Sequence, residues 1–301
     1  MPQKIHPTAC IDPSARLGED VSVGPYTIIG ANVQIGARTE ILANVTIGAD
    51  TIIGTDNEIH SGAIIGDKPQ DISYHNDRSN VIIGNGNKIR EYATIHKATG
   101  DGQSTLVGDN NFIMSFVHIA HNCRIGNNVV LVNLVQLAGH VQIADNATLG
   151  GMAAVPQHLR VGRLAMIGAY SRLFQDVPPF MLAEGNPAEV HSLNIVGLKR
   201  NPQLVPPEIA PVIKNAYRIL YRQHNNVSQA VARIQKECLL NGELPEQIRQ
   251  LIEFSRTAKK GISRSASKNK DLLQSEESGF EETQPFFEKM YTVFNKKIHR
   301  Q

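Results

Sequence analysis

The sequence contains no tryptophan, and aromatic residues make up only 5% of its 301 residues. A globular core of this size normally uses more aromatic side chains, so their scarcity favours a narrow core filled by aliphatic side chains. Cysteine is scarce as well. Cys10, Cys123 and Cys238 are widely spaced and odd in number, which argues against a disulfide framework and indicates a reducing compartment.

An excess of charge of one sign and long apolar runs are also lacking. The net charge at pH 7 is +2, so the composition does not predict a nucleic acid as partner. No run of about 18 apolar residues predicts an integral membrane segment, and residues 1–14 lack the apolar stretch of a signal peptide. The sequence has no CxxC pair of the kind that would suggest a metal site. We therefore expect a cytoplasmic protein.

The strongest pattern is an aliphatic residue at every sixth position. Starting from Ile5, 26 of the 29 positions between residues 5 and 173 are Ile, Leu or Val, whereas ordinary composition gives about a quarter. The exceptions are Asp71, Asp77 and Asp101. Glycine often follows the aliphatic residue, as at Gly18, and we expect these glycines to adopt turn dihedrals that a Cβ atom would resist.

This repeat predicts a mainly β fold. Each six-residue unit forms a short strand and a turn, and one strand can bury its aliphatic face only if successive coils stack. Three units make one triangular coil, and a step of six residues does not follow one face of an α-helix. The pattern resembles hexapeptide-repeat proteins, which implies a left-handed parallel β-helix over residues 1–180, although the general crossover rule favours the right hand.

Two segments interrupt the repeat without shifting its phase. They lie at about residues 67–80 and 97–104. The aliphatic positions on either side of them are eighteen and twelve residues apart, and both distances are multiples of six. We interpret them as loops that leave one continuous prism. Loops on a rigid scaffold often carry function, and a tolerated surface insertion is the alternative interpretation.

The character of the sequence changes after residue 180. The segment QDVPP at 175–179 ends the repeat, because proline stops strand pairing. Residues 181–264 predict a small α-helical C-terminal domain, with helices at 209–223, 228–240 and 245–258. We expect Ser228 to cap the second of these helices and Asn241-Gly242 to end it. Residues 265–301 predict a disordered tail, in which 286–298 could form an amphipathic helix; a solvated tail is favoured over a partner-binding segment.

Two histidines flank an inward-facing residue of the repeat. His118 and His121 lie on either side of Ile119 and Ala120, so both should face outward, and His140 follows soon after. A neutral imidazole can act as a general base near neutral pH. Solvated or subunit-packing histidines are the plain alternative. A zinc site shared across a subunit boundary is another, but no carboxylate or thiolate companion adjoins these histidines.

These histidines belong to a larger set of motifs. In chain order these motifs include Asn57-Glu58-Ile59, Gln70-Asp71, Lys88-Ile89-Arg90-Glu91, Thr94-Ile95-His96, His118-Ile119-Ala120-His121, Leu137-Ala138-Gly139-His140, Gly150-Gly151-Met152 and Gly197-Leu198-Lys199-Arg200. Through this set the sequence resembles the UDP-N-acetylglucosamine O-acyltransferase (LpxA) family from about residue 3 to about residue 264. Many proteins share the repeat, whereas this motif set is much narrower.

The resemblance implies a homotrimeric enzyme without a cofactor. It would move an (R)-3-hydroxyacyl chain from acyl carrier protein to the 3-hydroxyl of UDP-N-acetylglucosamine (UDP-GlcNAc), the first step of lipid A biosynthesis. His121 matches the catalytic base, and Gly139 matches the residue whose N–H faces the developing oxyanion. Ala169 matches the position that limits acyl-chain length. The matches to substrate-binding positions are Gln70, Asp71, His118, His140, Gln157, Asn194 and Arg200.

Charge complementarity adds a candidate surface for the acidic carrier protein. It consists of Lys214, Arg218 and Arg222, which lie beside the apolar stripe of the first predicted helix. No metal ligand is predicted in this region or elsewhere.

Several positions depart from the family's pattern. Asn122 follows the predicted base where the family has Asp, which would orient the imidazole and stabilise its cation. Pro156, Ser73, Val196 and Asn201 stand where His, Lys, Glu and Arg are common. Two other functions therefore stay open. One is transfer to a 3-amino sugar nucleotide, which gives an amide, and the other is a sugar-nucleotide-binding scaffold without catalysis.

Overall fold

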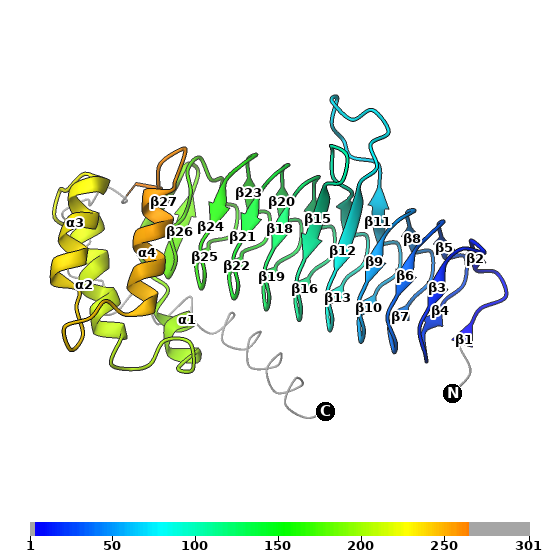
Figure 1. The fold of residues 1–301 in the computed structure, drawn as a ribbon, viewed down its shortest axis with the longest axis horizontal. Helices are drawn as coiled ribbons and strands as arrows, with labels where there is room; N and C mark the ends of the chain where they lie inside the picture. Colours follow the sequence, from blue (N-terminus) through cyan, green and yellow to red (C-terminus); the bar gives the residue numbers. More distant parts are fainter. Residues whose placement is uncertain (1–3, 265–301) are drawn as a thin grey trace. The chain divides into compact units, whose positions relative to one another are not determined.

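The computed structural model describes residues 4–264, in which short strands stack into a three-sided prism (Figure 1). Within these residues eleven strands form sheet A, and sheets B and C have eight strands each. Sheet A contains β1 Lys4–Ile5, β4 Ser22–Val23, β7 Glu40–Ile41, β10 Glu58–Ile59, β13 Lys88–Ile89, β16 Phe112–Ile113, β19 Val130–Leu131, β22 Thr148–Leu149, β25 Met166–Ile167, β26 Met181–Gly185 and β27 Ala188–Leu193. Sheet B contains β2 Cys10–Ile11, β5 Ile28–Ile29, β8 Thr46–Ile47, β11 Ile64–Asp67, β14 Thr94–His96, β17 His118–Ile119, β20 Gln136–Leu137 and β23 Ala154–Val155. Sheet C contains β3 Arg16–Leu17, β6 Gln34–Ile35, β9 Ile52–Ile53, β12 Asn80–Ile83, β15 Ser104–Val107, β18 Arg124–Ile125, β21 Gln142–Ile143 and β24 Arg160–Val161.

The core of the prism is a column of stacked aliphatic side chains. Each strand pairs in parallel with the strand one coil away, so that Ile29 pairs with Ile47 and Ile47 pairs with Ile65. All three side chains are at most 2% exposed. The six-residue step therefore identified the inward residues and their register, and the predicted mainly β fold of hexapeptide coils is confirmed.

The glycines of the repeat have a different role from the one we expected. The residue with positive φ lies three positions after the aliphatic residue and is usually not glycine; Asn32 and Asn44, both with φ 58°, are examples. Gly18 instead sits where successive coils approach closely. A Cβ atom there would lie 2.7 Å from the backbone nitrogen of Ala37 in the next coil. The expectation about turn dihedrals was wrong, because close backbone packing is what selects glycine at this position.

The residues with positive φ give each corner of the prism its own chemistry. Between sheets A and B they form an apolar corner ridge on five successive coils, consisting of Tyr92, Phe116, Leu134, Met152 and Tyr170. Between sheets C and A they are mostly polar, with Leu164 as an apolar exception. Between sheets B and C they include Asn32 and Asp50 in the early coils and Asn122, His140 and His158 in the later ones. The corner between sheets B and C thus collects the histidines that the sequence analysis singled out.

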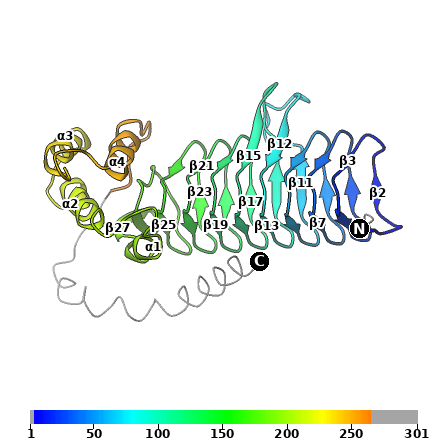
Figure 2. The same ribbon diagram turned by 60° about the horizontal axis from the view of Figure 1, so that its bottom comes forward.

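Both loops leave the prism at this same corner (Figures 1 and 2). They join β11 to β12 and β14 to β15, and the register confirms that neither shifts the repeat, since Ile65 pairs with Ile95 and Ile83 with Val107. The Arg78 N–H donates to Asp101 (2.8 Å), and the Gly100 N–H donates to Asp77 (2.6 Å). Two of the three aspartates that break the repeat therefore tie the loops together.

The chain continues as strands beyond residue 180, where we expected helices. β26 pairs in parallel with β25 and forms an antiparallel hairpin with β27, which extends sheet A. The sequence signal was the alternation of buried Ala188 and Val190 with partly exposed Glu189 and His191, which is a strand pattern. The helices that follow are α1 Ile195–Arg200, α2 Ala210–Tyr221, α3 Val227–Glu237 and α4 Glu246–Arg256.

The cap of α3 differs from the prediction. The side chain of Asn226, not that of Ser228, accepts a hydrogen bond from the Gln229 N–H, and the Asn226 N–H donates in turn to the Gln229 side chain. The helix ends at Glu237, before the Asn241-Gly242 turn. No helix in residues 4–264 combines the length and apolarity that crossing a membrane requires. The predicted tail at 265–301 lies outside the described residues.

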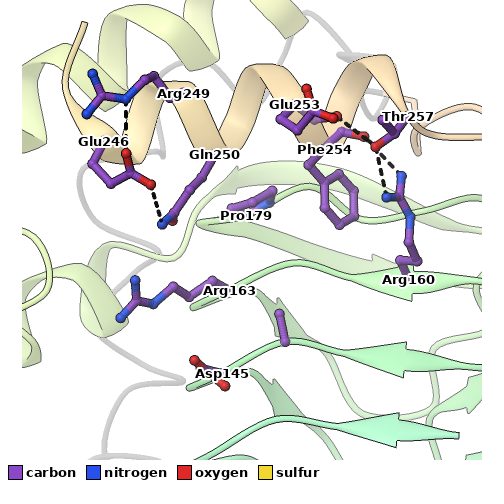
Figure 3. A pocket seen from close by; sticks show the side chains of 11 residues that line it. Asp145, Arg160, Arg163, Pro179, Glu246, Arg249, Gln250, Glu253, Phe254 and Thr257 are labelled. Atoms are coloured by element: carbon purple, nitrogen blue, oxygen red, sulfur yellow. Dashed lines mark hydrogen bonds and ion pairs between the residues drawn. The ribbon is translucent and has the colours of Figure 1, made fainter.

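One arginine fastens α4 to the end of the prism (Figure 3). Arg160 pairs with buried Asp176 (2.8 Å), donates to Thr257 (3.0 Å) and to the Phe254 carbonyl (3.0 Å), and lies over the Phe254 ring. After α4 the chain returns to the prism, where Ile262 bridges to Asp176 and the Lys260 ammonium donates to the Gln157 carbonyl. The helical end is therefore held rigidly next to the last coils.

Candidate active site

His121 lies outside the aliphatic core of the prism, as expected, yet it is only 4% exposed. Its Nδ1 lies 2.9 Å from Oδ1 of Asn122, and its Nε2 lies 3.7 Å from Oδ2 of Asp71 in the first loop. The ring of His140 meets the His121 ring edge-on at 5.3 Å. The first loop and the next coil thus cover an imidazole that the repeat alone would leave on the surface.

Asp71 presents a negative charge to this imidazole. The N–H of Ser73 and its hydroxyl both donate to the Asp71 carboxylate, at 3.0 and 2.8 Å. These hydrogen bonds lower the pKa of Asp71 to about 2, so that the carboxylate is ionised at neutral pH. The distance of 3.7 Å is too long for a hydrogen bond to His121, but a hydroxyl placed beside the pair can contact both atoms.

Gly139 packs directly against the His121 ring. A Cβ atom on Gly139 would overlap Cε1 and Nε2 of that ring and would lie 3.0 Å from its Nδ1. The neighbouring N–H groups are used in the coil, from Ala138 to Val155 and from His140 to His121. The Gly139 N–H has no acceptor among residues 4–264, so it can donate to a ligand atom next to the imidazole.

A second pair of histidines lines sheet B beside His121. His118 Nδ1 lies 2.7 Å from the Thr94 hydroxyl, and its ring meets the His96 ring edge-on at 5.1 Å. Burial lowers the pKa of His118 to about 4 and also lowers the pKa of His96 and His140. All three rings are therefore neutral at pH 7, which suits hydrogen bonding to a substrate.

These pKa shifts predict that the protein loses stability in mild acid. An unfolded histidine has a pKa of about 6.5, so between that pH and about 4 the unfolded chain binds more protons than the folded chain. The stabilisation is present above pH 6.5 and declines as the pH falls. We expect the urea midpoint to fall between pH 7 and 4.5, and to fall less steeply in His118→Gln. His6→Gln, at the exposed first coil, is the control. If the urea midpoint of His118→Gln falls with pH as steeply as that of the unmodified protein, the lowered pKa of His118 does not contribute to the loss of stability.

The other predicted site residues do not all lie beside His121. Gln70 is exposed in the first loop, next to Asp71, and Gln157 is exposed next to His158 at the same corner. Asn194 lies elsewhere. Its side chain caps α1 through the Gly197 N–H and donates to the Leu164 carbonyl (2.9 Å), which is at the corner between sheets C and A. Arg200 ends α1.

Ala169, the predicted acyl-chain-length position, lies at the corner between sheets A and B. It lies next to the exposed Tyr170, at the end of the apolar corner ridge. One chain therefore brings together Asp71, His118, His121, Gly139 and His140, but it leaves Asn194 and Ala169 at the other two corners.

The three predicted carrier-protein contacts are not equivalent. Lys214 and Arg218 are exposed one turn apart on α2. Arg222 is half-buried, where its guanidinium donates to the His191 carbonyl (2.7 Å) and lies over the Tyr217 ring. The structure thus attaches Arg222 to the β27 hairpin, whereas Lys214 and Arg218 project toward solvent.

Three further residues of the site were not identified from the sequence. His158 stacks on His140 with ring centroids 4.5 Å apart and extends the row of rings from His121. His96 is 6% exposed, and Thr99 of the second loop contacts Asn122. The six-residue step could have found His158, because it is eighteen residues after His140 and so occupies the same corner. Within residues 4–264, no group of three or more His, Cys, Asp or Glu side chains could hold a metal ion.

The coils and the helical end place the chain among the hexapeptide-repeat transferases. Residues 104–139 match the family model of the bacterial transferase hexapeptide (six repeats). Residues 176–263 match the second domain of UDP-N-acetylglucosamine O-acyltransferase. The first match lies within the prism, and the second spans the end of the prism, the β26–β27 hairpin and the C-terminal helices. The chain thus forms a left-handed parallel β-helix followed by a few helices.

Relatives that match most of the chain identify the family. Two proteins named acyl-[acyl-carrier-protein]--UDP-N-acetylglucosamine O-acyltransferase are 53% and 51% identical, from Sulfurihydrogenibium sp. (strain YO3AOP1) and Ralstonia nicotianae. They cover 91% and 87% of this chain and 99% and 98% of their own. The solved UDP-N-acetylglucosamine acyltransferase of Francisella novicida is 37% identical with a TM-score of 0.81, over 89% of this chain and 96% of its own. The chain belongs to the UDP-N-acetylglucosamine O-acyltransferase family.

Proposed function

We propose that this protein transfers an (R)-3-hydroxyacyl chain from acyl carrier protein to the 3-hydroxyl of UDP-GlcNAc, the first step of lipid A biosynthesis. The observation that carries the proposal is the set of contacts around His121. A buried imidazole has one nitrogen held by Asn122, the other beside the Asp71 carboxylate, and the Gly139 backbone against its ring. These are the parts that acyl transfer to a hydroxyl requires.

The reaction follows from these positions. Nε2 of His121 takes the proton of the sugar hydroxyl while that oxygen attacks the thioester carbonyl carbon. The oxyanion that forms accepts a hydrogen bond from the N–H of Gly139. The C–S bond then breaks, the carbonyl re-forms as an ester, and the leaving thiolate takes the proton from His121. Asp71 accepts a hydrogen bond from the sugar, which holds the hydroxyl beside Nε2.

A homotrimer completes this site in our proposal. On one chain, Asn194, which caps the helix that ends at Arg200, lies at a different corner from the histidines. A nucleotide that contacts both Asn194 and the histidines therefore needs a neighbouring subunit. The apolar corner ridge supports such a neighbour. Its five side chains are between 41% and 73% exposed, and a continuous apolar strip of this kind marks a protein interface. A closed ring of three subunits would cover it.

The ridge provides a test of the trimer. Phe116→Glu puts a charge in the middle of the strip, so we expect sedimentation to show dissociation and the assay to show loss of turnover, while circular dichroism stays unchanged. Asn44→Glu is the control, since Asn44 has the same backbone conformation at the same corner but lies outside the ridge. A Phe116→Glu protein that sediments as an intact trimer would show that the ridge is not the interface.

The direct experiment supplies purified protein with carrier-linked 3-hydroxyacyl donors of several lengths and UDP-GlcNAc. Mass spectrometry should detect a singly acylated sugar nucleotide, and mild base should release the acyl chain from it as expected for an ester. The proposal fails if no donor gives product. Turnover of any kind excludes a scaffold without catalysis.

One observation favours a second candidate, transfer to the amine of a 3-amino sugar nucleotide. The partner of His121 Nδ1 is the neutral Asn122 rather than a carboxylate, which makes a less strongly activated base. A neutral amine attacks a thioester without prior deprotonation and loses its proton afterwards. The same assay with the amino acceptor would then give a base-stable amide, and the ratio of kcat/KM for the two acceptors decides between them.

We also propose that the acyl donor approaches α2. Lys214 and Arg218 are the exposed predicted cations there, and an acidic carrier protein complements them.

The cysteines of the described residues are all unpaired, which supports a reducing compartment and therefore the cytoplasm as the place of action.

A further inference from the structure

The residue after the proposed base is held in an uncommon conformation. Asn122 has φ 59°, at the corner where β17 ends, and its N–H donates to the Thr105 hydroxyl (2.9 Å) inside the prism. Asparagine tolerates this left-handed conformation better than most residues. The backbone of Asn122 is thus anchored to the prism, and its side chain is directed toward the second loop.

The second loop determines which way the Asn122 carboxamide faces. The Thr99 N–H donates to Oδ1 of Asn122 (3.0 Å), and Nδ2 of Asn122 donates to the Thr99 carbonyl (3.1 Å). In the opposite orientation two donors would face each other, and so would two acceptors. The backbone of one loop residue therefore selects a single orientation of this amide.

That orientation determines the tautomer of His121. Oδ1 of Asn122 is the atom that lies 2.9 Å from His121 Nδ1, and an amide oxygen can only accept a hydrogen bond. Nδ1 must therefore carry the proton, which leaves Nε2 unprotonated beside the Asp71 carboxylate. Nε2 is the nitrogen that the proposed reaction uses as base.

We propose that Asn122 and the backbone of Thr99 form a tautomer clamp, in which the second loop positions the base of the active site without supplying a charge. The proposal rests on the proposed function for its kinetic consequence, although the tautomer itself does not depend on it. One oxygen of an aspartate could accept hydrogen bonds from the Thr99 N–H and from His121 Nδ1, as Oδ1 of Asn122 does. Its second oxygen would then face the Thr99 carbonyl, and two acceptors would lie against each other. The loop backbone is therefore matched to an amide at this position.

Asn122→Gly tests the clamp most cleanly. Glycine adopts the same left-handed conformation without strain, so the variant removes the carboxamide and little else. Asn128→Gly makes the same change at an exposed left-handed corner remote from the histidines and serves as the control. Neutron crystallography of each perdeuterated protein locates the deuterons on the His121 ring, and steady-state kinetics separates kcat from KM.

We expect the unmodified protein and Asn128→Gly to carry the deuteron on Nδ1. In Asn122→Gly we expect it on Nε2 or on both nitrogens, with kcat lower by on the order of 100-fold and KM for the sugar nucleotide little changed. Asn122→Asp should keep the Nδ1 deuteron, since a carboxylate also accepts. A merely structural role for Asn122 would lower stability without moving the deuteron.

The outcomes separate this inference from the proposed function. An Nε2 deuteron in the unmodified protein overturns the clamp, and so does an Nδ1 deuteron with undiminished kcat in Asn122→Gly. If neither acceptor is turned over but the deuteron moves in Asn122→Gly, the proposed function fails and the clamp stands.

Discussion

His121→Ala should lower kcat by about 1,000-fold and leave the fold and the oligomeric state intact. Removal of a general base costs about 10²- to 10⁴-fold, and here the imidazole lies beside both the Asp71 carboxylate and the Gly139 backbone. Its loss leaves the aliphatic column untouched, since His121 lies outside that core. Single-turnover kinetics with carrier-linked donor, together with sedimentation, measures both effects.

Two comparisons make the His121 result specific. His6→Ala removes a histidine from the exposed first coil, where the His6 ring contacts Thr8, and should leave kcat unchanged. A lower kcat with an unchanged KM indicates loss of an interaction made in the transition state, whereas a raised KM alone would indicate lost binding. Full activity of His121→Ala would refute the proposed mechanism.

The prism could be predicted from the sequence because one rule governs it. Every sixth residue must be aliphatic for coils to stack, so the pattern specifies the inward residues and the register, as the pairing of Ile47 with Ile65 illustrates. The rule says nothing about residues that leave the prism. The six-residue step does not predict the hairpin at 181–193, and it does not predict the contact between Asp71 and His121. Both are known only from the structure.

The geometry of the candidate site was predictable in part for the same reason. The step identified His118 and His121 as facing away from the core, and resemblance assigned them roles. It could not predict that His121 is buried, because the burial comes from loops whose paths depend on long-range contacts such as Arg78 to Asp101. Asn122 looked like a loss of charge in the sequence alone, whereas its contacts with Thr99 show an amide suited to its surroundings.

Gly139→Ala is expected to reduce kcat/KM by at least about 100-fold through geometry alone. The added methyl would occupy the space of Cε1 and Nε2 of the His121 ring, and that ring cannot move freely because Asn122 holds its Nδ1. A displacement of about 1 Å at a reacting group is enough for a loss of this size. The φ of Gly139 is not in the left-handed region, so the alanine backbone is unstrained and the fold should survive.

Gly151→Ala is the matched control for this steric effect. Gly151 also lies two residues after the inward aliphatic residue of its coil, but a Cβ atom there would meet its nearest neighbour, the Asn133 carbonyl, at an ordinary contact distance of 3.4 Å. We expect Gly151→Ala to keep its activity and its thermal midpoint.

Gly139→Ala should keep its thermal midpoint while it loses turnover. The double variant that combines Gly139→Ala with His121→Ala should be no slower than His121→Ala alone. An independent, multiplied loss in the double variant would show that Gly139 acts on the reaction by some route other than the position of the His121 ring.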